Sequence, residues 1–192
     1  NPQDLVWAGD VQHSIQRDDL LLAEPSWREE VSRHFRKASA WVNLEKMPGP
    51  RVCASVFKLG PDGKQHSRAL DQVARRCFLV VEHDHLSLDE QGAMLRWLRE
   101  KAKLRLRAVV FTGGKSLHGW FDFPTHPHEV AMLRVMLCGV QEEIVEEGRA
   151  KRVWRGGLGF DAAIFNAVQP WKVPGWPHPK TGNLCTLMWL EG

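Results

Sequence analysis

Residues 78–86 read Phe-Leu-Val-Val-Glu-His-Asp-His-Leu, an apolar run that turns abruptly acidic. Four consecutive apolar residues predict a strand that is buried on both faces. Side chains alternate along a strand, so Glu82 and Asp84 should share one face, about 7 Å apart. His83 and His85 should point to the opposite face. Two carboxylates held in this way form half of a site for a hard cation, which prefers oxygen ligands.

The same two acids also fit a plainer structure, in which they are the solvated end of a strand or pair with Arg75 or Arg76. Spacing alone does not separate the two interpretations. The metal-site hypothesis therefore depends on whether the rest of the chain supplies a third acid and ligands for phosphate.

The composition is that of an ordinary soluble globular domain, with 192 residues, 43% hydrophobic and 26% charged. A net charge of only +3 excludes a polycationic tail, so contact with nucleic acid would have to come from local clusters. The four cysteines form no Cys-x-x-Cys pair, which favours reduced thiols in a cytoplasmic protein without structural zinc. No apolar run reaches the roughly 20 residues of a membrane span.

Two further features bear on function. The chain begins at Asn1 rather than at a methionine, so we expect it to be part of a longer polypeptide. It contains nine tryptophans and no tyrosine, which excludes any mechanism that needs a tyrosine nucleophile.

Periodicity and capping signals predict an α+β protein, with helices packed on a mainly antiparallel sheet. A capping box at residues 26–29 begins a helix to about Trp41, and Ser87 caps another that runs past Leu98. A 3-4-3-4 spacing of apolar residues predicts a long helix over about 128–147. We expect strands at 52–59, 78–86, 105–112, 117–123 and 184–190, and short elements at 161–167 and at 70–74, where strand and helix both fit.

A glycine turn carries the second group of polar residues, in the segment Thr-Gly-Gly-Lys-Ser-Leu-His at 112–118. Glycines let the backbone approach a ligand closely. Ser116 and His118 are two residues apart, so they share a face if they begin a strand. A hydroxyl, an imidazole and nearby N–H groups suit the oxygens of a triphosphate. A plain hairpin turn with a surface histidine would have the same sequence.

Two later segments add an acid and a basic loop. Asp161 follows an apolar residue and precedes a small-residue element. Residues 171–182, Trp-Lys-Val-Pro-Gly-Trp-Pro-His-Pro-Lys-Thr-Gly, combine cations, rigid prolines and tryptophan rings. Lys172 and Lys180 could bind phosphate as point charges. The alternative is a rigid surface loop whose tryptophans bury against the core.

Taken in order, these segments resemble the archaeo-eukaryotic primase superfamily, specifically the primase-polymerase domains of plasmid, phage and mobile-element replication proteins. That family has an apolar strand ending in acid-x-acid, then Ser-x-His after a small-residue turn, a lone Asp, and a basic Pro-Gly loop ending in Lys-Thr-Gly. The chain departs from it at Lys172, where members often carry arginine, whose bidentate fork lysine lacks. The matching residues, within roughly 50–190, are Glu82, Asp84, Ser116, His118, Asp161, Lys172-Val173-Pro174-Gly175 and Lys180-Thr181-Gly182.

The resemblance implies a single domain over 1–192, with an α/β portion (1–75) packed on an RRM-like antiparallel sheet with helices (76–192) and the active site between them. It implies two Mg²⁺ or Mn²⁺ ions held by Glu82, Asp84 and Asp161, with NTP or dNTP as substrate. It also implies a single-stranded DNA template and primer as partners, and a helicase domain in the same polypeptide. The nucleotide would be bound by Lys115, Ser116, His118, Lys172 and Lys180.

Basic clusters supply candidates for the nucleic-acid contact, although each residue could equally lie on a solvated face. One cluster spans residues 96–107 and the other 149–155. Trp176 in the Pro-Gly loop could stack on bases. The candidates are Arg99, Lys103, Arg149, Lys151, Arg152 and Trp176.

Three other functions fit parts of the sequence. A rolling-circle replication initiator would use a His-x-His metal site and a tyrosine nucleophile. The chain has no tyrosine, and His83 and His85 should face away from Glu82. A metal-dependent nuclease leaves the Ser-x-His pair and the Pro-Gly loop unexplained. A non-catalytic nucleotide- or DNA-binding module would have no use for three converging carboxylates, which repel one another without metal.

Overall fold

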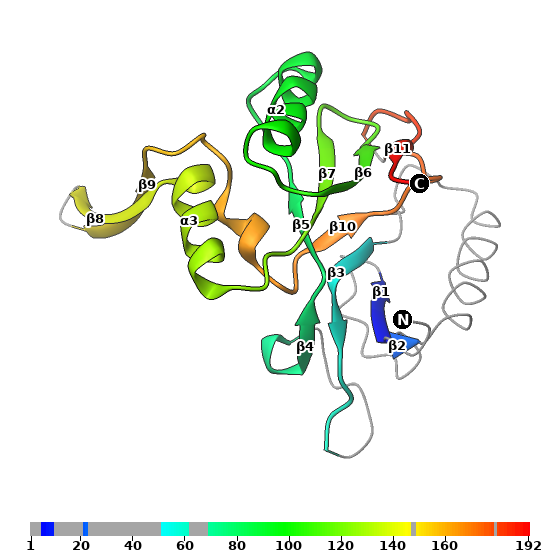
Figure 1. Cartoon of the computed structure of the whole chain (residues 1–192), viewed down its shortest axis with the longest axis horizontal. Coiled ribbons are helices and arrows are strands. Elements are labelled where there is room, and N and C mark those ends of the chain that lie inside the picture. The colour runs from blue at the N-terminus through cyan, green and yellow to red at the C-terminus, as the bar shows by residue number, and fades with distance from the viewer. Residues whose placement is uncertain (1–4, 10–20, 23–50, 62–68, 147–148, 179) are drawn as a thin grey trace.

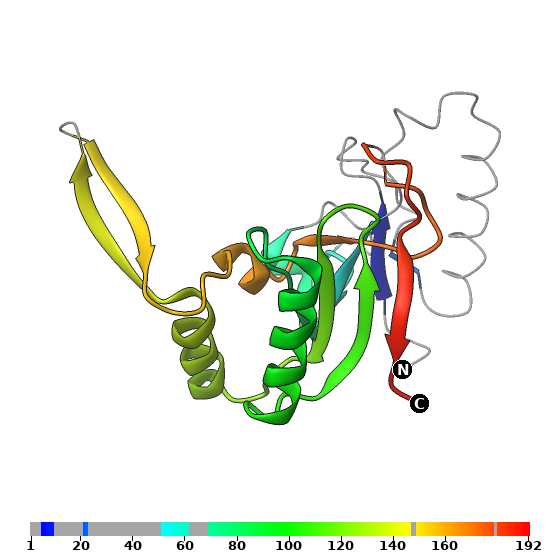
Figure 2. The ribbon, with the colours of Figure 1, turned by 90° about the horizontal axis from the view of Figure 1, so that it is seen from above.

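The computed structural model describes residues 5–9, 21–22, 51–61, 69–146, 149–178 and 180–192. Two antiparallel sheets adjoin each other, and a long hairpin projects from one end of the molecule (Figures 1 and 2). The described part is α+β, as predicted, with helices α2 (Leu88–Glu100) and α3 (Pro127–Cys138). Neither helix is long and apolar enough to cross a membrane. The helix predicted from residue 26 lies outside the described residues.

The first sheet joins the N-terminal strands to a late one, in the order β10-β3-β1-β2, with β4 also paired to β3. β3 confirms the strand predicted at 52–59, and its side chains are buried from Cys53 to Phe57. The segment near 70–74 contains both possible elements, because a 3-10 turn at Leu70–Gln72 leads directly into β4. The strands are β1 (Leu5–Gly9), β2 (Leu21–Leu22), β3 (Arg51–Phe57), β4 (Val73–Arg76) and β10 (Pro170–Lys172).

The second sheet has the order β11-β6-β7-β5 and contains the other four predicted strands. Leu79, Val80 and Val81 of β5 are fully buried, and they pack with Phe121 and Leu98 in the main core. This confirms that the apolar run forms a strand covered on both faces. The strands are β5 (Phe78–Val81), β6 (Leu106–Phe111), β7 (Leu117–Asp122) and β11 (Thr186–Leu190).

β5 ends at Val81, so the prediction that Glu82 and Asp84 lie on the strand itself is wrong. The cause is the side chain of His83, which is buried against Phe160 with ring centroids 5.1 Å apart. Its Nδ1 accepts the backbone N–H groups of His85 and Leu86, at 3.2 and 3.3 Å, which turns the chain away from the sheet. The two acids therefore follow the strand in a loop shaped by His83.

α2 begins where the sequence predicted. The Ser87 hydroxyl caps the Glu90 N–H, and the Glu90 carboxylate returns to the Ser87 N–H at 2.8 Å, completing a capping box. Leu95 and Leu98 are buried, and Leu95 packs directly on β7 at Gly119, where a Cβ would overlap its side chain. This close approach fixes the helix against the strand that carries His118.

The long helix predicted over 128–147 is wrong beyond Cys138, where α3 ends. Gly139 has φ of 90°, and a Cβ there would meet the Arg155 carbonyl, so the chain turns sharply at this glycine. The following residues pair with a later strand instead of continuing the helix. They form the projecting hairpin, β8 (Val140–Glu146) and β9 (Arg149–Arg155), which Figure 2 shows extending away from α3.

Candidate functional site

A cavity of about 270 Å³ lies where the two sheets adjoin. β3 and β10 of the first sheet form one wall, and the loop after β5, the 112–116 turn and β7 form the other. Six of the residues singled out from the sequence line it: Glu82, Asp84, Lys115, Ser116, His118 and Lys172. The remaining lining residues are Arg51, Thr112, Gln169, Pro170, Trp171 and His178.

Glu82 is the carboxylate at the centre of the site. Its Oε2 lies 2.8 Å from Nε2 of His118, and the side chain is 29% exposed. Burial opposes ionisation, but the hydrogen bond from His118 and the charges of His118, Lys172 and Arg51 outweigh it and lower the pKa of Glu82. The carboxylate is therefore ionised at neutral pH, as a metal or cation ligand must be.

His118 is held on both sides. Its ring packs edge-on against Trp171 of β10, with centroids 5.1 Å apart, and the residue is only 3% exposed. Nε2 is engaged by Glu82, whereas the buried Nδ1 has no hydrogen-bond partner among the described residues. His118 therefore links the two sheets and holds the Glu82 carboxylate in place at the cavity.

Asp84 and Lys115 form a more exposed pair at the mouth of the cavity. Lys115 Nζ lies 3.5 Å from the Asp84 carboxylate and donates to the Asp84 carbonyl oxygen at 2.9 Å. Both side chains are more than half exposed, so this ion pair contributes little to stability. Asp84 is consequently free to exchange its partner when a ligand arrives.

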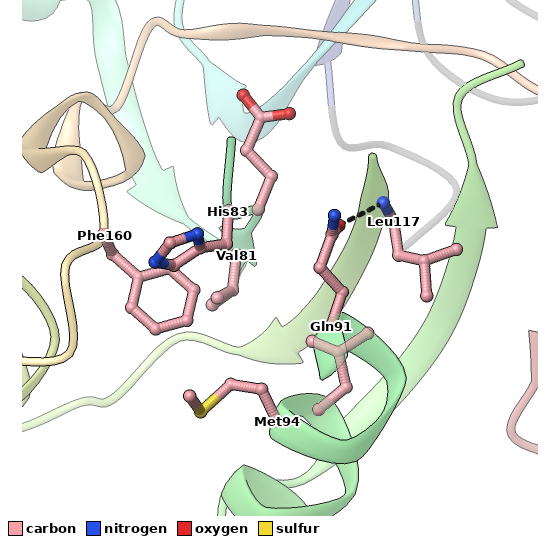
Figure 3. A pocket seen from close by; sticks show the side chains of 8 residues that line it. Val81, His83, Gln91, Met94, Leu117 and Phe160 are labelled. Carbon is pink, nitrogen blue, oxygen red and sulfur yellow. Dashed lines mark hydrogen bonds between the residues drawn. The ribbon is translucent and has the colours of Figure 1, made fainter. Parts of the chain in front are cut away.

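Gln91 of α2 joins the acidic loop to the 112–118 turn. Its Nε2 donates to the carbonyls of Leu86 and Lys115, at 2.7 and 2.9 Å. Its Oε1 accepts the Leu117 N–H at 2.7 Å, the bond drawn in Figure 3. The cavity beside it holds only about 10 Å³, room for at most one water. Gln91 thus holds the acidic loop and the 112–118 turn together without lining the cavity itself. It was not predicted, because the residues around it in the sequence form no motif.

The Gly113-Gly114 turn has a different role from the one predicted. The glycines were expected to let a ligand approach the backbone, but the Pro-Gly loop covers them instead. The Asn183 carbonyl and the His178 side chain lie where Cβ atoms would stand, and the Thr181 hydroxyl donates to the Gly113 carbonyl. The glycines therefore serve to dock the described residues of the chain's own Pro-Gly loop, 173–178 and 180–183, beside the cavity.

Replacing Gly113 with alanine is expected to destabilise the protein by about 2 kcal/mol or more. Gly113 has φ of 77°, and its new Cβ would overlap the Asn183 carbonyl and lie 2.9 Å from the His178 Cβ. Gly175→Ala is a matched control, because Gly175 has φ of 93° and open space around it. Urea denaturation should show a loss at least about 1 kcal/mol larger for Gly113→Ala. Equal losses would contradict the docking of the loop on this turn.

Asp161 does not line the cavity. Its carboxylate caps the 3-10 turn at Ala162–Phe165, accepting the Ala163 N–H at 2.8 Å. No group of three or more His, Cys, Asp or Glu side chains in the described residues is arranged to hold a metal ion. Glu82 and Asp84 both line the cavity, and carboxylate oxygens are the ligands that hard divalent cations prefer. Metal binding by Glu82, Asp84 and Asp161 stays a prediction.

Trp176 cannot stack on bases as predicted, because this residue of the Pro-Gly loop is buried, with 7% of its surface exposed. The alternative read from the sequence, a rigid loop with buried tryptophans, describes it correctly. Lys180 is exposed and lies outside the cavity lining, and its backbone N–H donates to His178 Nδ1 at 3.2 Å.

The predicted nucleic-acid residues lie away from the cavity. Arg99 is exposed on α2, 3.5 Å from Glu100. The basic residues of 149–155 form strand β9, opposite acids of β8. Lys151 pairs with Glu146 at 3.3 Å, and the neighbours opposite Arg149 and Arg152 are also glutamates. The acids offset much of the positive charge.

Lys103 lines a second, larger cavity of about 620 Å³ between α3 and the end of β7. This cavity is at the far end of β7 from His118. Its lining is mainly apolar, including Leu133 and Met136, and its acids Asp122 and Glu129 do not converge with other metal-binding side chains. Size alone therefore does not make it the better candidate.

Arg51, Thr112, Gln169 and His178 also line the site and were not predicted. The sequence around Arg51 and Gln169 contains no recognisable motif. The two residues come together at the cavity because β10 pairs with β3. Comparison with known proteins adds no assignment, since no protein-family model, curated protein or solved structure matches the chain.

Proposed function

We propose that the chain is a template-directed nucleotidyltransferase, a primase-polymerase domain that makes or extends primers on single-stranded DNA. One observation supports this most. The acid-x-acid pair, the Ser-x-His pair and Lys172 come from three distant segments, and they line one cavity at the junction of two sheets. Arg51 and Lys115 add positive charge around the carboxylates, as a polyphosphate ligand requires.

Each of the residues that line the cavity would have its own role in the reaction. Glu82 and Asp84 would hold a Mg²⁺ or Mn²⁺ ion, which when bound activates the attacking 3′-oxygen and stabilises the leaving pyrophosphate. Ser116 and His118 offer a hydroxyl and an imidazole to the triphosphate. Lys172, whose pKa is lowered first by burial and then by Arg51, lines the same cavity and would contribute its amine to phosphate binding.

We also propose the primase fold, with single-stranded DNA and a helicase domain as partners. The order β5-α2-β6-β7-α3, followed after β8, β9 and β10 by β11, supports an RRM-like catalytic portion. However, β11 lies beside β6 and not beside β5 as in a split β-α-β sheet. Single-stranded DNA would pass the cavity mouth, with Arg99, Lys103 and the β8–β9 hairpin as candidate contacts. A helicase domain in the same polypeptide belongs to the same proposal.

A non-catalytic nucleotide-binding module is the second candidate. It is favoured by the position of Asp161, which leaves two carboxylates rather than three in the cavity. Each of the two also has a cationic or imidazole partner, so neither needs a metal to offset repulsion.

One incubation separates the candidates. The protein is mixed with a labelled primer on a single-stranded template, with NTPs or dNTPs and Mn²⁺, and the products are sized. We expect template-dependent extension. Shortening of the primer would identify a nuclease, and nucleotide binding without either change would identify the module.

A further inference from the structure

His178, from the Pro-Gly loop, is one of the residues that line the candidate site. Its ring covers Gly114, with Nε2 3.1 Å from the position a Cβ would occupy. A side chain at this position would require the ring to shift by a few tenths of an ångström. The imidazole therefore forms part of the cavity wall beside Lys115 and Ser116.

The orientation and tautomer of the ring are fixed by its own loop. Nδ1 accepts the Lys180 N–H at 3.2 Å, so the ring proton is carried by Nε2. The backbone of His178 is held as well, because its N–H donates to Asn183 and its carbonyl accepts the Gly182 N–H, both at 2.8 Å. The N–H that remains to be used is at Nε2, on the Gly114 side of the ring.

The surroundings keep this ring uncharged. Burial, followed by the charges of Lys172, Arg51 and Lys180, lowers the pKa of His178, so the imidazole is neutral at pH 7. The other ionisable side chains that line the cavity are Lys115, Glu82, Asp84 and His118. Protonation of Nδ1 would also set two donors against each other, since the Lys180 N–H already points at it.

We propose that His178 is a phosphate-binding residue of this site, donating Nε2–H as a neutral imidazole to an anionic oxygen of the ligand. The inference rests on the proposed function only in taking a polyphosphate as the ligand. Lysine and arginine supply the charge at the site, and His178 supplies a directed hydrogen bond. It also couples the occupied cavity to the loop over residues 173–183.

Two substitutions separate this role from a purely structural one. His178→Gln keeps an N–H donor near the position of Nε2 but loses the acceptor for Lys180. His178→Asn keeps an acceptor near the position of Nδ1 but loses the distant donor. His126→Asn, at the exposed N-cap of α3, is the matched control.

Binding of inorganic tripolyphosphate, as its Mg²⁺ complex, is measured by calorimetry. We expect His178→Asn to weaken binding about tenfold or more, because a hydrogen bond to a charged group is lost. His178→Gln and His126→Asn should stay within about threefold of the unsubstituted protein. The reverse result, in which His178→Gln binds tripolyphosphate weakly and His178→Asn binds it normally, would show that the histidine only stabilises its loop. That result would overturn the inference. Unchanged binding in both variants, or no binding by the unsubstituted protein, would overturn it too.

Imidazole ¹⁵N shifts provide a second readout. At pH 7 Nδ1 should remain unprotonated with and without tripolyphosphate, while the Nε2 proton becomes protected from exchange. Protonation of both nitrogens on binding would contradict a neutral donor. The primer-extension assay is scored separately. If primers are extended but the His178 substitutions leave tripolyphosphate binding unchanged, only this inference is wrong. If the substitutions weaken binding but no primer is extended, only the nucleotidyltransferase proposal is wrong.

Discussion

Asp84→Ala is expected to abolish primer extension, lowering the rate by about 10³-fold or more, while the fold stays intact. Asp84 is one of two carboxylates lining the cavity, and a divalent cation there would lose half of its protein ligands. Such an ion contributes several kcal/mol to the transition state of phosphoryl transfer, which corresponds to this loss of rate. The measurement is single-turnover extension with Mn²⁺ over a range of concentrations.

The fold should tolerate the change, since the Asp84 side chain is exposed and its pairing with Lys115 is a surface ion pair. The melting temperature should fall by no more than about 2 °C. Asp71→Ala, an exposed carboxylate in the 3-10 turn before β4, is the control and should extend primers normally. An active Asp84→Ala protein would remove the metal-dependent mechanism from consideration.

Sequence reasoning succeeded where the deciding interaction is local. Three features depend only on residues that are close together in the sequence. They are the N-cap at Ser87, the apolar run of β5 and the glycine turn before β7. Their positions were predicted to within a few residues, and the structure confirms α2 and the β6–β7 hairpin.

It failed where a distant segment decides the conformation. Val140 and Ile144 fit a helical spacing, but they equally alternate along a strand, and pairing with β9 selects the strand. β10 has only three residues and forms because β3 is already there to pair with it. The end of β5 is set by His83, whose ring accepts the N–H groups of His85 and Leu86 and packs against the distant Phe160.

The candidate site follows the same division. Motif residues such as Glu82 and His118 were identified because their chemistry is visible in the residue type. The Glu82–His118 hydrogen bond was not foreseen, because it needs the end of β5 and the start of β7 to be adjacent. Gln91 has no sequence signal at all, and His178 lies in the basic Pro-Gly segment but comes to the cavity only because that loop covers the 113–114 turn.

Gln91→Leu is expected to destabilise the protein by about 3 kcal/mol, lowering the melting temperature by about 6–12 °C. Leucine fills nearly the same volume but leaves the carbonyls of Leu86 and Lys115 and the N–H of Leu117 without their partner. Gln91 is only 3% exposed, so water cannot readily replace the lost hydrogen bonds. Thermal and urea denaturation measure the loss.

The same substitution should also lower extension activity in protein that remains folded. Gln91 connects the loop that carries Asp84 to the turn that carries Ser116 by hydrogen bonds. Without these bonds, the two segments no longer keep a fixed position relative to each other. Gln141→Leu, exposed on β8, removes an amide without touching this link and should leave both stability and activity near their starting values. If Gln91→Leu melts with the unsubstituted protein, or is destabilised yet fully active, the amide does not position the site. The acidic loop and the Ser-x-His turn would then have to be held together by the Glu82–His118 contact and the Lys115–Asp84 bonds at the mouth of the cavity.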